Sequence, residues 1–282
     1  MKKLVVIGDP INHSLSPLIH NAALKALELD KDFYYEKQRM NHEELADFIQ
    51  SMRDGEIVGA NVTLPHKETV MKYLDGVTQE AKLIGAVNTL YSERGKIIGD
   101  NTDGIGFLTS LKENEINVTH KKIVILGAGG AARAAAITLA HYNTRKLVIL
   151  NRSVKKAKIL SKDIEEKIGK KVRVKSLKKI EEETKDAEIL INCTSVGMKN
   201  KQENKTLVVS KMLNSHTTVI DIIYNPLKTK LLREAEIAGC KTINGTGMLI
   251  HQAAAAFKMW TGKTPPLKTM KNTLLTHLEG AQ

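Results

Sequence analysis

Seven polar or charged residues in the first part of the chain lie at or just past the ends of short apolar runs that are typical of strands. They are Ser14, Ser16, Asn61, Thr63, Lys67, Asn88 and Asp103. In open α/β sheets, ligands bind outside the carboxyl ends of the strands. Two hydroxyl groups beside a helix start suit a carboxylate ligand. The spacing therefore predicts a ligand site in this part of the chain, although each residue also has a local structural explanation.

Those local explanations differ from residue to residue. Ser16, which precedes a proline, has the type expected at a helix N-cap, and Asp103 can cap the helix expected over 104–115. Lys67 is expected in the first turn of a helix, where a cation opposes the positive end of the helix dipole; such a conflict is a hint of function. A solvated surface lysine is the alternative. His66 carries no such hint and is expected to be structural.

A second group of residues has the spacing of a dinucleotide-binding loop. Lys121–Leu126 predicts a strand, Gly127-Ala128-Gly129-Gly130-Ala131-Ala132 follows it, and Arg133–His141 predicts a helix. This is the G-x-G-x-x-G/A pattern in the strand–loop–helix context that it requires. The first glycine would form the tight turn, the second would admit a pyrophosphate, and the helix N-terminus would supply N–H donors.

The next strand indicates which nucleotide this loop would bind. NAD-binding folds carry an acidic residue at its end, which accepts a hydrogen bond from the ribose 2′-hydroxyl. Here the strand expected over Leu147–Leu150 ends in Asn151-Arg152-Ser153, followed by Lys155 and Lys156, with no carboxylate. Arginine, hydroxyl and lysine groups suit a 2′-phosphate, so NADP is predicted over NAD. The alternative is that Asn151 and Ser153 only cap the following helix, a role that is compatible with phosphate binding.

The elements that must position these residues alternate between strands and helices until about Gly245. Amphipathic stretches separate the β-branched runs at 17–29, 42–52, 131–142 and 153–168. This alternation is typical of α/β folds in which helices cover mainly parallel sheets. A chain of 282 residues suggests about two domains, and the pattern places a boundary near Asp103–Gly104.

Composition narrows the classes of function. The formal net charge of +12 fits either a nucleic-acid binder or a solvated basic surface around a site for an anionic ligand. Aromatic residues make up only 4% of the chain, so no nucleic-acid partner is expected. No apolar run is long enough for a membrane span or a signal peptide. The chain is therefore expected to have no membrane partner and to be located in the cytoplasm. Cys193 and Cys240 lack the spacing of metal ligands, so no metal site is expected.

Eight motifs of the chain, taken together, resemble the shikimate dehydrogenase family. They are NHSLSP (12–17), NVTLPHK (61–67), GAVNT (85–89), GDNTDGIG (99–106), GAGGAAR (127–133), NCTSVGM (192–198), DIIYNP (221–226) and GMLIHQAAAAF (247–257). The motifs cover the chain from end to end in the family's order, which is far more specific than the glycine loop alone.

The resemblance implies an NADP-dependent oxidoreductase acting on a CH–OH group. Its reaction would be the reversible NADPH-linked reduction of 3-dehydroshikimate to shikimate, a step of chorismate and aromatic amino-acid biosynthesis. Residues 1–104 plus 247–282 would form the substrate-binding catalytic domain, and 105–246 a Rossmann-like NADP domain. The C-terminal helices would return to the first domain, and the protein would be a monomer or a homodimer.

The resemblance also implies roles for individual residues. Lys67 and Asp103 resemble the catalytic pair, with Lys67 as the main acid–base group. The residues similar to substrate contacts are Ser14 and Ser16 for the carboxylate, Asn61, Thr63, Asn88 and Gln252 for the ring hydroxyls, and Tyr224 beside substrate and nicotinamide. Those similar to cofactor contacts are Gly127, Ala128, Gly129, Gly130, Ala131, Asn151, Arg152, Ser153, Lys155, Lys156, Thr194, Ile222, Gly245 and Met248.

Three departures from the family pattern and two alternatives remain open. After Asn151, Lys155 and Lys156 stand where some relatives have an arginine, while Arg152 remains. Lys199–Lys205, expected to be a loop, lacks the prolines that many relatives carry there, and Gln79 stands where an acidic residue is frequent. One alternative is a quinate/shikimate dehydrogenase that uses NAD, which the missing carboxylate near Asn151 opposes. The other is a sensor that binds NADP without turnover, which a direct assay would expose.

Overall fold

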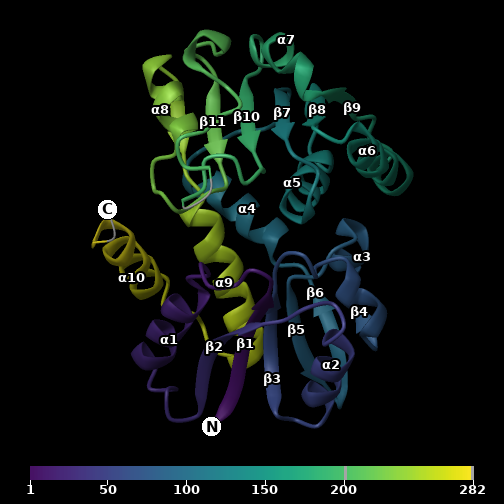
Figure 1. Ribbon diagram of the computed structural model, residues 1–282, viewed down its shortest axis with the longest axis vertical. Helices are drawn as coiled ribbons and strands as arrows, with labels where there is room; N and C mark the ends of the chain where they lie inside the picture. Colours follow the sequence, from purple (N-terminus) through teal and green to yellow (C-terminus); the bar gives the residue numbers. More distant parts are fainter. Residues whose placement is uncertain (200–201, 281–282) are drawn as a thin grey trace. The chain divides into compact units, whose positions relative to one another are not determined.

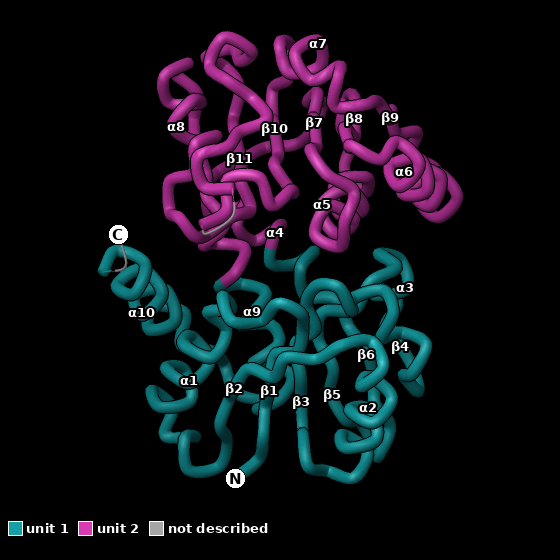
Figure 2. The backbone as a smooth tube through the Cα atoms, in the orientation of Figure 1, with its two compact units in different colours: residues 1–106, 250–281 teal, residues 107–249, 282 magenta. Residues whose placement is uncertain are grey.

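The computed structural model describes residues 1–199 and 202–280, so part of the Lys199–Lys205 loop lies outside the described residues. The described chain forms two compact units, both of the expected α/β class: unit 1, residues 1–106 and 250–280, and unit 2, residues 107–249 (Figures 1 and 2). The chain leaves unit 1 within helix α4 (Asp103–Glu113) and returns within helix α9 (Thr246–Thr261). Unit 2 is therefore one uninterrupted stretch, and unit 1 is made of two.

Unit 1 is built on a mixed sheet with the strand order β2-β1-β3-β5-β6-β4. The strands are β1 (Lys2–Gly8), β2 (Phe33–Arg39), β3 (Ile57–Val62), β4 (Gly76–Val77), β5 (Thr89–Glu93) and β6 (Lys96–Asp100). β1 pairs in parallel with β2 and β3, whereas β5 runs antiparallel to β3 and β6. The start of β5 therefore lies at the same edge of the sheet as the ends of β3 and β6. This topology brings Asn88, just before β5, to the residues that follow β3 and β6.

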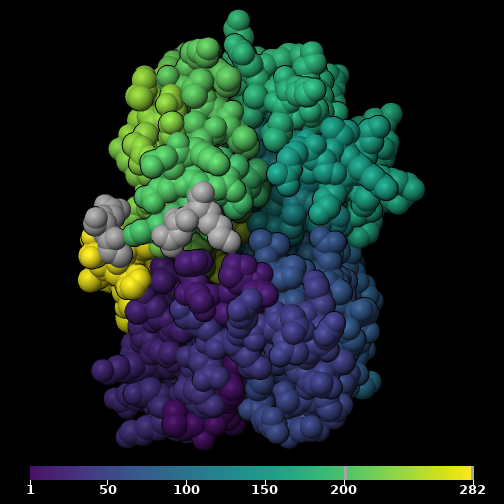
Figure 3. All heavy atoms as spheres, in the orientation of Figure 1, coloured from purple at the N-terminus to yellow at the C-terminus, as the bar shows by residue number. Residues whose placement is uncertain are grey.

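Several helices belong to unit 1. They are α1 (Ser16–Ala26), α2 (Leu45–Arg53), α3 (Gln79–Ile84), part of α9, and α10 (Leu267–Gly280). Val5 and Ile7 of β1 pack with Phe48 and Ile49 of α2 in one buried cluster, as expected for a central strand covered on its faces. α10 packs against α1. The C-terminal helices thus return to unit 1 as expected, and Figure 3 shows their yellow atoms beside the purple N-terminal ones.

Unit 2 is built on a fully parallel sheet with the strand order β12-β11-β10-β7-β8-β9. The strands are β7 (Lys122–Leu126), β8 (Lys146–Asn151), β9 (Arg173–Ser176), β10 (Ile189–Asn192), β11 (Thr218–Asp221) and β12 (Lys241–Ile243), and the helices are α5 (Gly130–Ala140), α6 (Val154–Ile168), α7 (Ile180–Thr184) and α8 (Lys230–Ile237), with most of α4. This is the doubly wound order of dinucleotide-binding folds, whose direction reverses between β7 and β10. Ligands bind at such a switch point, so the loops after β7 and β10 are where a nucleotide is expected.

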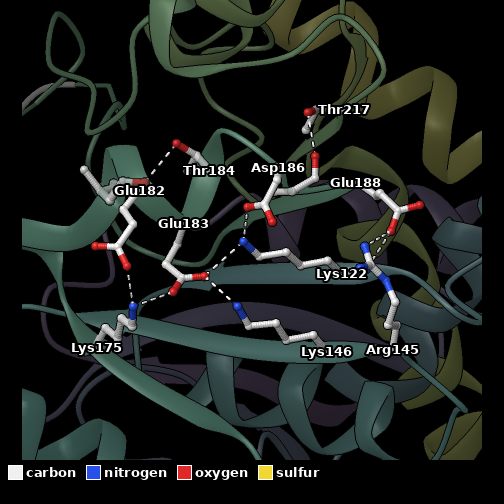
Figure 4. Close-up of polar contacts among 12 residues, drawn as sticks. Lys122, Arg145, Lys146, Lys175, Glu182, Glu183, Thr184, Asp186, Glu188 and Thr217 are labelled. Atoms are coloured by element: carbon white, nitrogen blue, oxygen red, sulfur yellow. Dashed lines mark hydrogen bonds and ion pairs between the residues drawn. The ribbon is translucent and has the colours of Figure 1, made fainter.

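An ion-pair cluster lies near the starts of β7 and β8 (Figure 4). Glu183, whose side chain is 3% exposed, accepts from Lys122 at 3.0 Å, Lys146 at 3.2 Å and Lys175 at 2.8 Å. Lys122 and Lys146 are the first residues of β7 and β8. A buried carboxylate is tolerated only when it is paired in this way. The cluster thus joins α7 to the first residues of β7 and β8 and to Lys175, the third of the four residues of β9.

Two structural tests apply to the described part of the chain. Within residues 1–199 and 202–280, no helix has both the length and the apolar character that a membrane crossing requires. Over the same residues, no group of three or more His, Cys, Asp or Glu side chains could hold a metal ion.

Candidate active site

The loop after β1 carries the two serines predicted to bind a carboxylate. The prediction that Ser16 is the N-cap of α1 is wrong: Leu15 holds that position and Ser16 is the first helical residue. Pro17 needs no hydrogen-bond acceptor in the first turn, which lets the helix begin one residue earlier. The Ser14 hydroxyl instead accepts from the backbone N–H of Ser16 at 3.3 Å, and Ser16 is buried. Both serines thus lie at the start of α1.

Lys67 lies in a turn between β3 and the short 3₁₀-helix Thr69–Tyr73, not in the first turn of an α-helix as predicted. The helical segment that follows is 3₁₀ and ends at Tyr73, and the chain is extended again at Leu74. His66 is fully buried, with Nε2 2.7 Å from the carbonyl oxygen of Met40. This neighbour anchors the backbone beside Lys67 and holds the lysine in place.

Lys67 and Asp103 form a close ion pair. The Lys67 Nζ donates to Oδ2 of Asp103 at 2.5 Å, and the two side chains are 15% and 8% exposed. Asn88 Nδ2 donates to the other oxygen of Asp103, Oδ1, at 2.8 Å. A charge-assisted hydrogen bond of this kind is short and strong, and its low exposure limits screening by water. The arrangement presents a protonated amine whose position is fixed by a carboxylate.

The segment before α4 fixes Asn88 and Asp103 in turn. Asn88 Oδ1 accepts from the backbone N–H of Thr102 at 2.8 Å, and Asn88 Nδ2 lies 3.5 Å from Gln252 Oε1 on α9. Asn101 Oδ1 accepts from the backbone N–H of Asp103 at 3.0 Å. Asn101 and Thr102 are buried and were not singled out from the sequence, although both belong to the motif GDNTDGIG.

The remaining predicted residues of unit 1 lie at the same edge of the sheet. Asn61, the fifth residue of β3, is buried and donates to the carbonyl oxygen of Asn88 at 3.1 Å. Thr63 follows β3 and is half-buried; its N–H donates to the carbonyl oxygen of Ile7 at 2.9 Å. Unit 1 thus brings its polar residues together through direct hydrogen bonds or neighbouring positions.

The glycine loop of unit 2 has the geometry that close approach of a phosphate requires. Gly127 has a φ of +112°, and a Cβ there would lie 3.0 Å from the carbonyl oxygen of Cys193. Gly129 is the N-cap of α5, is exposed, and has open space where a Cβ would point. Ala132 is fully buried against the strands. The N-terminus of α5 thus begins at an exposed glycine, the kind of helix start that suits an anion, whereas the N–H of Gly127 donates to the carbonyl oxygen of Leu150 at 2.8 Å.

The residues after β8 form the predicted basic group. Asn151 ends β8 and its Nδ2 donates to the carbonyl oxygen of Ser153 at 3.0 Å. Ser153 is the N-cap of α6, but its side chain makes no capping hydrogen bond. Arg152, Lys155 and Lys156 are exposed. Capping alone therefore does not explain the serine, and the position where NAD-binding folds place an acid holds an amide.

The loops after β10 and β11 are joined by a buried carboxylate. Asp221 Oδ1 accepts from Asn192 Nδ2 at 3.0 Å, and Asn192 Oδ1 accepts from the hydroxyl of Thr194 at 2.7 Å. Burial raises the pKa of Asp221 to about 6, against hydrogen bonds from Thr229, Ile223 and Asn192 that lower it. Asn192 and Asp221 were not predicted as site residues; the signal for them is a polar residue ending an apolar strand.

Gly245, Met248 and Tyr224, predicted to lie near the nicotinamide, all belong to unit 2. Gly245 packs so closely that a Cβ would lie 1.9 Å from the carbonyl oxygen of Ile222. Met248, in the first turn of α9, is buried. Tyr224 lies in the loop after β11, half-buried, and burial raises the pKa of its phenol. These residues thus belong to unit 2. Ser14, Ser16, Lys67 and Asp103 belong to unit 1.

Family models and known proteins match this chain over most of its length. The model of the shikimate dehydrogenase substrate binding domain matches residues 6–90, that of shikimate/quinate 5-dehydrogenase matches 110–227, and that of the shikimate 5′-dehydrogenase C-terminal domain matches 245–275. A shikimate dehydrogenase (NADP(+)) of Methanopyrus kandleri is 44% identical over 97% of this chain and 94% of its own. The chain belongs to the shikimate dehydrogenase family.

Solved structures of this family have the same fold. A crystal structure of a shikimate dehydrogenase in complex with NADP+ matches with a TM-score of 0.92 and 44% identity, over 99% of this chain and 96% of the other. A quinate dehydrogenase from Corynebacterium glutamicum in complex with NAD matches with a TM-score of 0.89 and 30% identity, over 98% and 99%. The predicted family and the two-part Rossmann-type fold are thus confirmed.

Proposed function

We propose that the chain is an NADP-dependent oxidoreductase that reduces 3-dehydroshikimate to shikimate and catalyses the reverse reaction. The observation that carries the proposal is the Lys67–Asp103 pair at 2.5 Å, with Asn88 on the second carboxylate oxygen, in the unit that matches a substrate-binding domain. Relatives that are 44% identical to this chain are named as NADP(+)-dependent shikimate dehydrogenases or were solved with NADP+, which supports the substrate and the cofactor.

In unit 1, Lys67 acts on the substrate oxygen that changes from a carbonyl to a hydroxyl group. Reduction of a carbonyl builds alkoxide character on that oxygen, and a proton must arrive with the hydride. The Lys67 ammonium stabilises the developing charge and donates the proton. Asp103 keeps Lys67 oriented, while Ser14 and Ser16 bind the substrate carboxylate. Asn61, Thr63, Asn88 and Gln252 bind the ring hydroxyls, in keeping with the resemblance.

In unit 2, the glycine loop and the residues after β8 hold the cofactor. When bound, NADPH supplies the hydride. The fit rests on Gly127, whose conformation excludes a side chain, and on the N–H groups of α5. Arg152, with Ser153, Lys155 and Lys156, binds the 2′-phosphate, and Asn151 lies beside it. Thr194, Ile222, Gly245 and Met248 line the nicotinamide, and Tyr224 lies beside nicotinamide and substrate.

The proposal includes a cellular setting. We place the reaction in the cytoplasm, as a step of chorismate and aromatic amino-acid biosynthesis, with unit 1 as the substrate-binding and unit 2 as the cofactor-binding domain. The partner is the small-molecule substrate, with no nucleic acid and no membrane. Sedimentation of the purified protein distinguishes the monomer from the homodimer.

An absorbance assay of reduced nicotinamide tests the proposal. Purified protein is given shikimate or quinate, each with NADP+ or NAD+. Turnover of shikimate with NADP+ far above the other three pairs is the expected result. It would establish the substrate and the cofactor together.

A quinate dehydrogenase that uses NAD is the second candidate, because one such enzyme has the same fold over nearly the whole chain. Preference for quinate or NAD+ in the assay would favour it and would leave the fold and the catalytic pair in place. No turnover with any pair, in a protein that still binds NADP+, would favour a sensor.

A further inference from the structure

Tyr35 is a buried phenol at the proposed substrate site to which nothing in the motifs assigns a role. It lies on β2 and is 3% exposed, and its hydroxyl donates to Asn61 Oδ1 at 2.6 Å. The side chain of Ser16 hydrogen-bonds to the same phenol oxygen. The phenol therefore touches two of the residues proposed to bind substrate.

The ring of Tyr35 packs in a cluster with the rings of His20 and Trp260, which lie 5.3 Å from each other. His20 of α1 stacks on it at 4.4 Å between ring centroids, and Trp260 of α9 lies 5.9 Å away. The sheet register explains this: Leu4 of β1 pairs with Tyr35 on one side and with Gly59 on the other. A side chain at Gly59 would collide with the Trp260 ring, so the glycine leaves the room that Trp260 fills. The phenol is thus fixed in direction.

The phenol also stays protonated. Burial raises the pKa of Tyr35 well above its usual value of 10, and the hydrogen bond from Ser16 only partly opposes this. A protonated phenol has one hydrogen to donate, and the 2.6 Å contact directs it at Asn61. Tyr35 is therefore held as a hydrogen-bond donor to Asn61.

A one-way chain of hydrogen bonds runs from Tyr35 to the catalytic pair. Asn61, which accepts from Tyr35, donates through Nδ2 to the hydroxyl of Thr89 at 3.3 Å. Thr89 donates to Asn88 Oδ1 at 2.9 Å. Asn88 donates through Nδ2 to Asp103 Oδ1 at 2.8 Å, and the chain ends on that carboxylate. The four donors of this chain point the same way, so each bond helps to fix and polarise the next. Asn88 Oδ1 also accepts from the backbone N–H and the hydroxyl of Thr102, at 2.8 and 3.1 Å.

We propose that Tyr35 is a positioning residue for the reaction, acting as the head of this chain, with Thr89 as its middle link. The proposal rests on the proposed function, because it concerns how the same site is held. The Tyr35 hydroxyl fixes which end of the Asn61 amide faces Thr89. Without it, Asn61 Oδ1 is buried with no donor, the amide can turn, and the chain to Asp103 is interrupted.

The first test replaces Tyr35→Phe, with Tyr34→Phe as the matched control. Tyr34 is the preceding residue of β2, so its side chain points to the opposite face of the sheet. For shikimate oxidation we expect Tyr35→Phe to lower kcat/KM about tenfold, the usual effect of losing one buried hydrogen bond. Tyr34→Phe should stay within twofold. The Kd for NADP+, measured by titration without substrate, should be unchanged in both.

The second test asks whether Tyr35 and Thr89 act through one chain. Thr89→Val removes the hydroxyl and should lower kcat/KM about tenfold, whereas Thr89→Ser keeps it and should restore most of the activity. In the double variant of Tyr35→Phe and Thr89→Val, the loss should be no more than about twice that of the worse single variant, because either change breaks the same chain. Independent contributions would multiply to about a hundredfold loss.

Thermal unfolding of each variant separates positioning from folding. A multiplicative double variant, an inactive Thr89→Ser, or a Tyr35→Phe with wild-type kcat/KM would overturn the proposal. Should Tyr35→Phe fail to fold, the comparison of Thr89→Val with Thr89→Ser decides it. Failure of the proposed function is distinct, because the wild-type protein would then not oxidise shikimate at all.

Discussion

Asn88 donates to Oδ1 of Asp103 at 2.8 Å, which leaves Oδ2 of the same carboxylate to Lys67. The two bonds approach opposite oxygens, so the carboxylate cannot turn without breaking one of them. Asp103 also takes its backbone position from Asn101. The direction of the Lys67 amine therefore depends on Asn88, which lies just before β5, whereas Lys67 itself follows β3.

Asn88→Asp tests this dependence. The change replaces a donor with a second carboxylate against Asp103, and like charges at this distance disfavour each other. We expect kcat/KM for shikimate to fall at least tenfold at pH 8 and to recover in part at lower pH, where one proton is shared. Asn88→Ala, which removes the donor without adding charge, should show no such recovery. Identical pH profiles for the two variants would contradict this account.

Lys67→Ala tests the acid–base assignment. Loss of a positioned proton donor costs at least about 10²-fold in kcat, and binding of shikimate should change little because the lost interaction forms mainly in the transition state. Stopped-flow turnover and calorimetric binding of shikimate measure the two effects separately. Lys72→Ala, an exposed lysine nearby, is the control. Near-native turnover of Lys67→Ala would show that another group moves the proton.

Arg152→Gln tests the preference for NADP. The guanidinium is the strongest partner for a 2′-phosphate among the residues after β8, because it is planar and always charged. We expect KM for NADP+ to rise about tenfold while KM for NAD+ stays the same. Arg173→Gln, also exposed, should change neither value. An equal rise for both nucleotides would place Arg152 elsewhere on the cofactor.

Gly245→Ala tests the close packing of the two loops in unit 2. Its Cβ would lie 1.9 Å from the carbonyl oxygen of Ile222, so the backbone must move. We expect the free energy of unfolding to fall by about 2 kcal/mol, as for other overpacked sites, and Kd for NADP+ to rise. Gly280→Ala has open space around its Cβ and should be neutral. Urea denaturation and nucleotide titration check both expectations.

Glu183→Gln tests the ion-pair cluster. Burial alone would raise the pKa of Glu183, but hydrogen bonds from Lys175, Lys122 and Lys146 outweigh it and lower the pKa to about 2. Since this is below the ordinary value of 4.5, the stabilisation is full above about pH 4.5 and is lost as the pH falls toward 2. At pH 7 we expect the variant to lose about 3 kcal/mol of unfolding free energy.

The difference between wild type and Glu183→Gln should therefore shrink in urea titrations below about pH 4.5. Glu182→Gln is the matched control, because Glu182 also pairs with Lys175 but its side chain is 52% exposed. It should cost less than about 1 kcal/mol. A difference for Glu183→Gln that is constant from pH 7 to pH 3 would rule out the paired carboxylate as its cause.

The sequence predicts most of the fold because apolar runs mark the buried strands. The strand predicted over Lys121–Leu126 agrees with β7 to within one residue, and the one predicted over Leu147–Leu150 lies within β8. Short or weakly patterned elements escape this reasoning. β4 has only two residues, β12 has three, and neither is long enough to show a period.

The candidate site is predicted in its location but not in its links. Strand ends point to Lys67, Asn88 and Asp103, and the topology brings them within hydrogen-bonding distance. Tyr35 escapes notice because its contact with Asn61 depends on the register of β2 and β3 on either side of β1. Local patterns do not encode a register between strands that are distant in the chain.

The interruption of unit 1 by unit 2 sets an order on biosynthesis. As the chain emerges from the ribosome, residues 107–249 are complete before Gln252 and Trp260 exist. Since a domain folds as a unit, the parallel sheet of unit 2 can form while unit 1 still waits for its last two helices. Trp260, which donates to the carbonyl oxygen of Leu90 at 2.9 Å, is among the last contacts that the first strands receive. A nascent chain released before residue 250 would therefore carry a finished nucleotide fold beside an unfinished substrate fold.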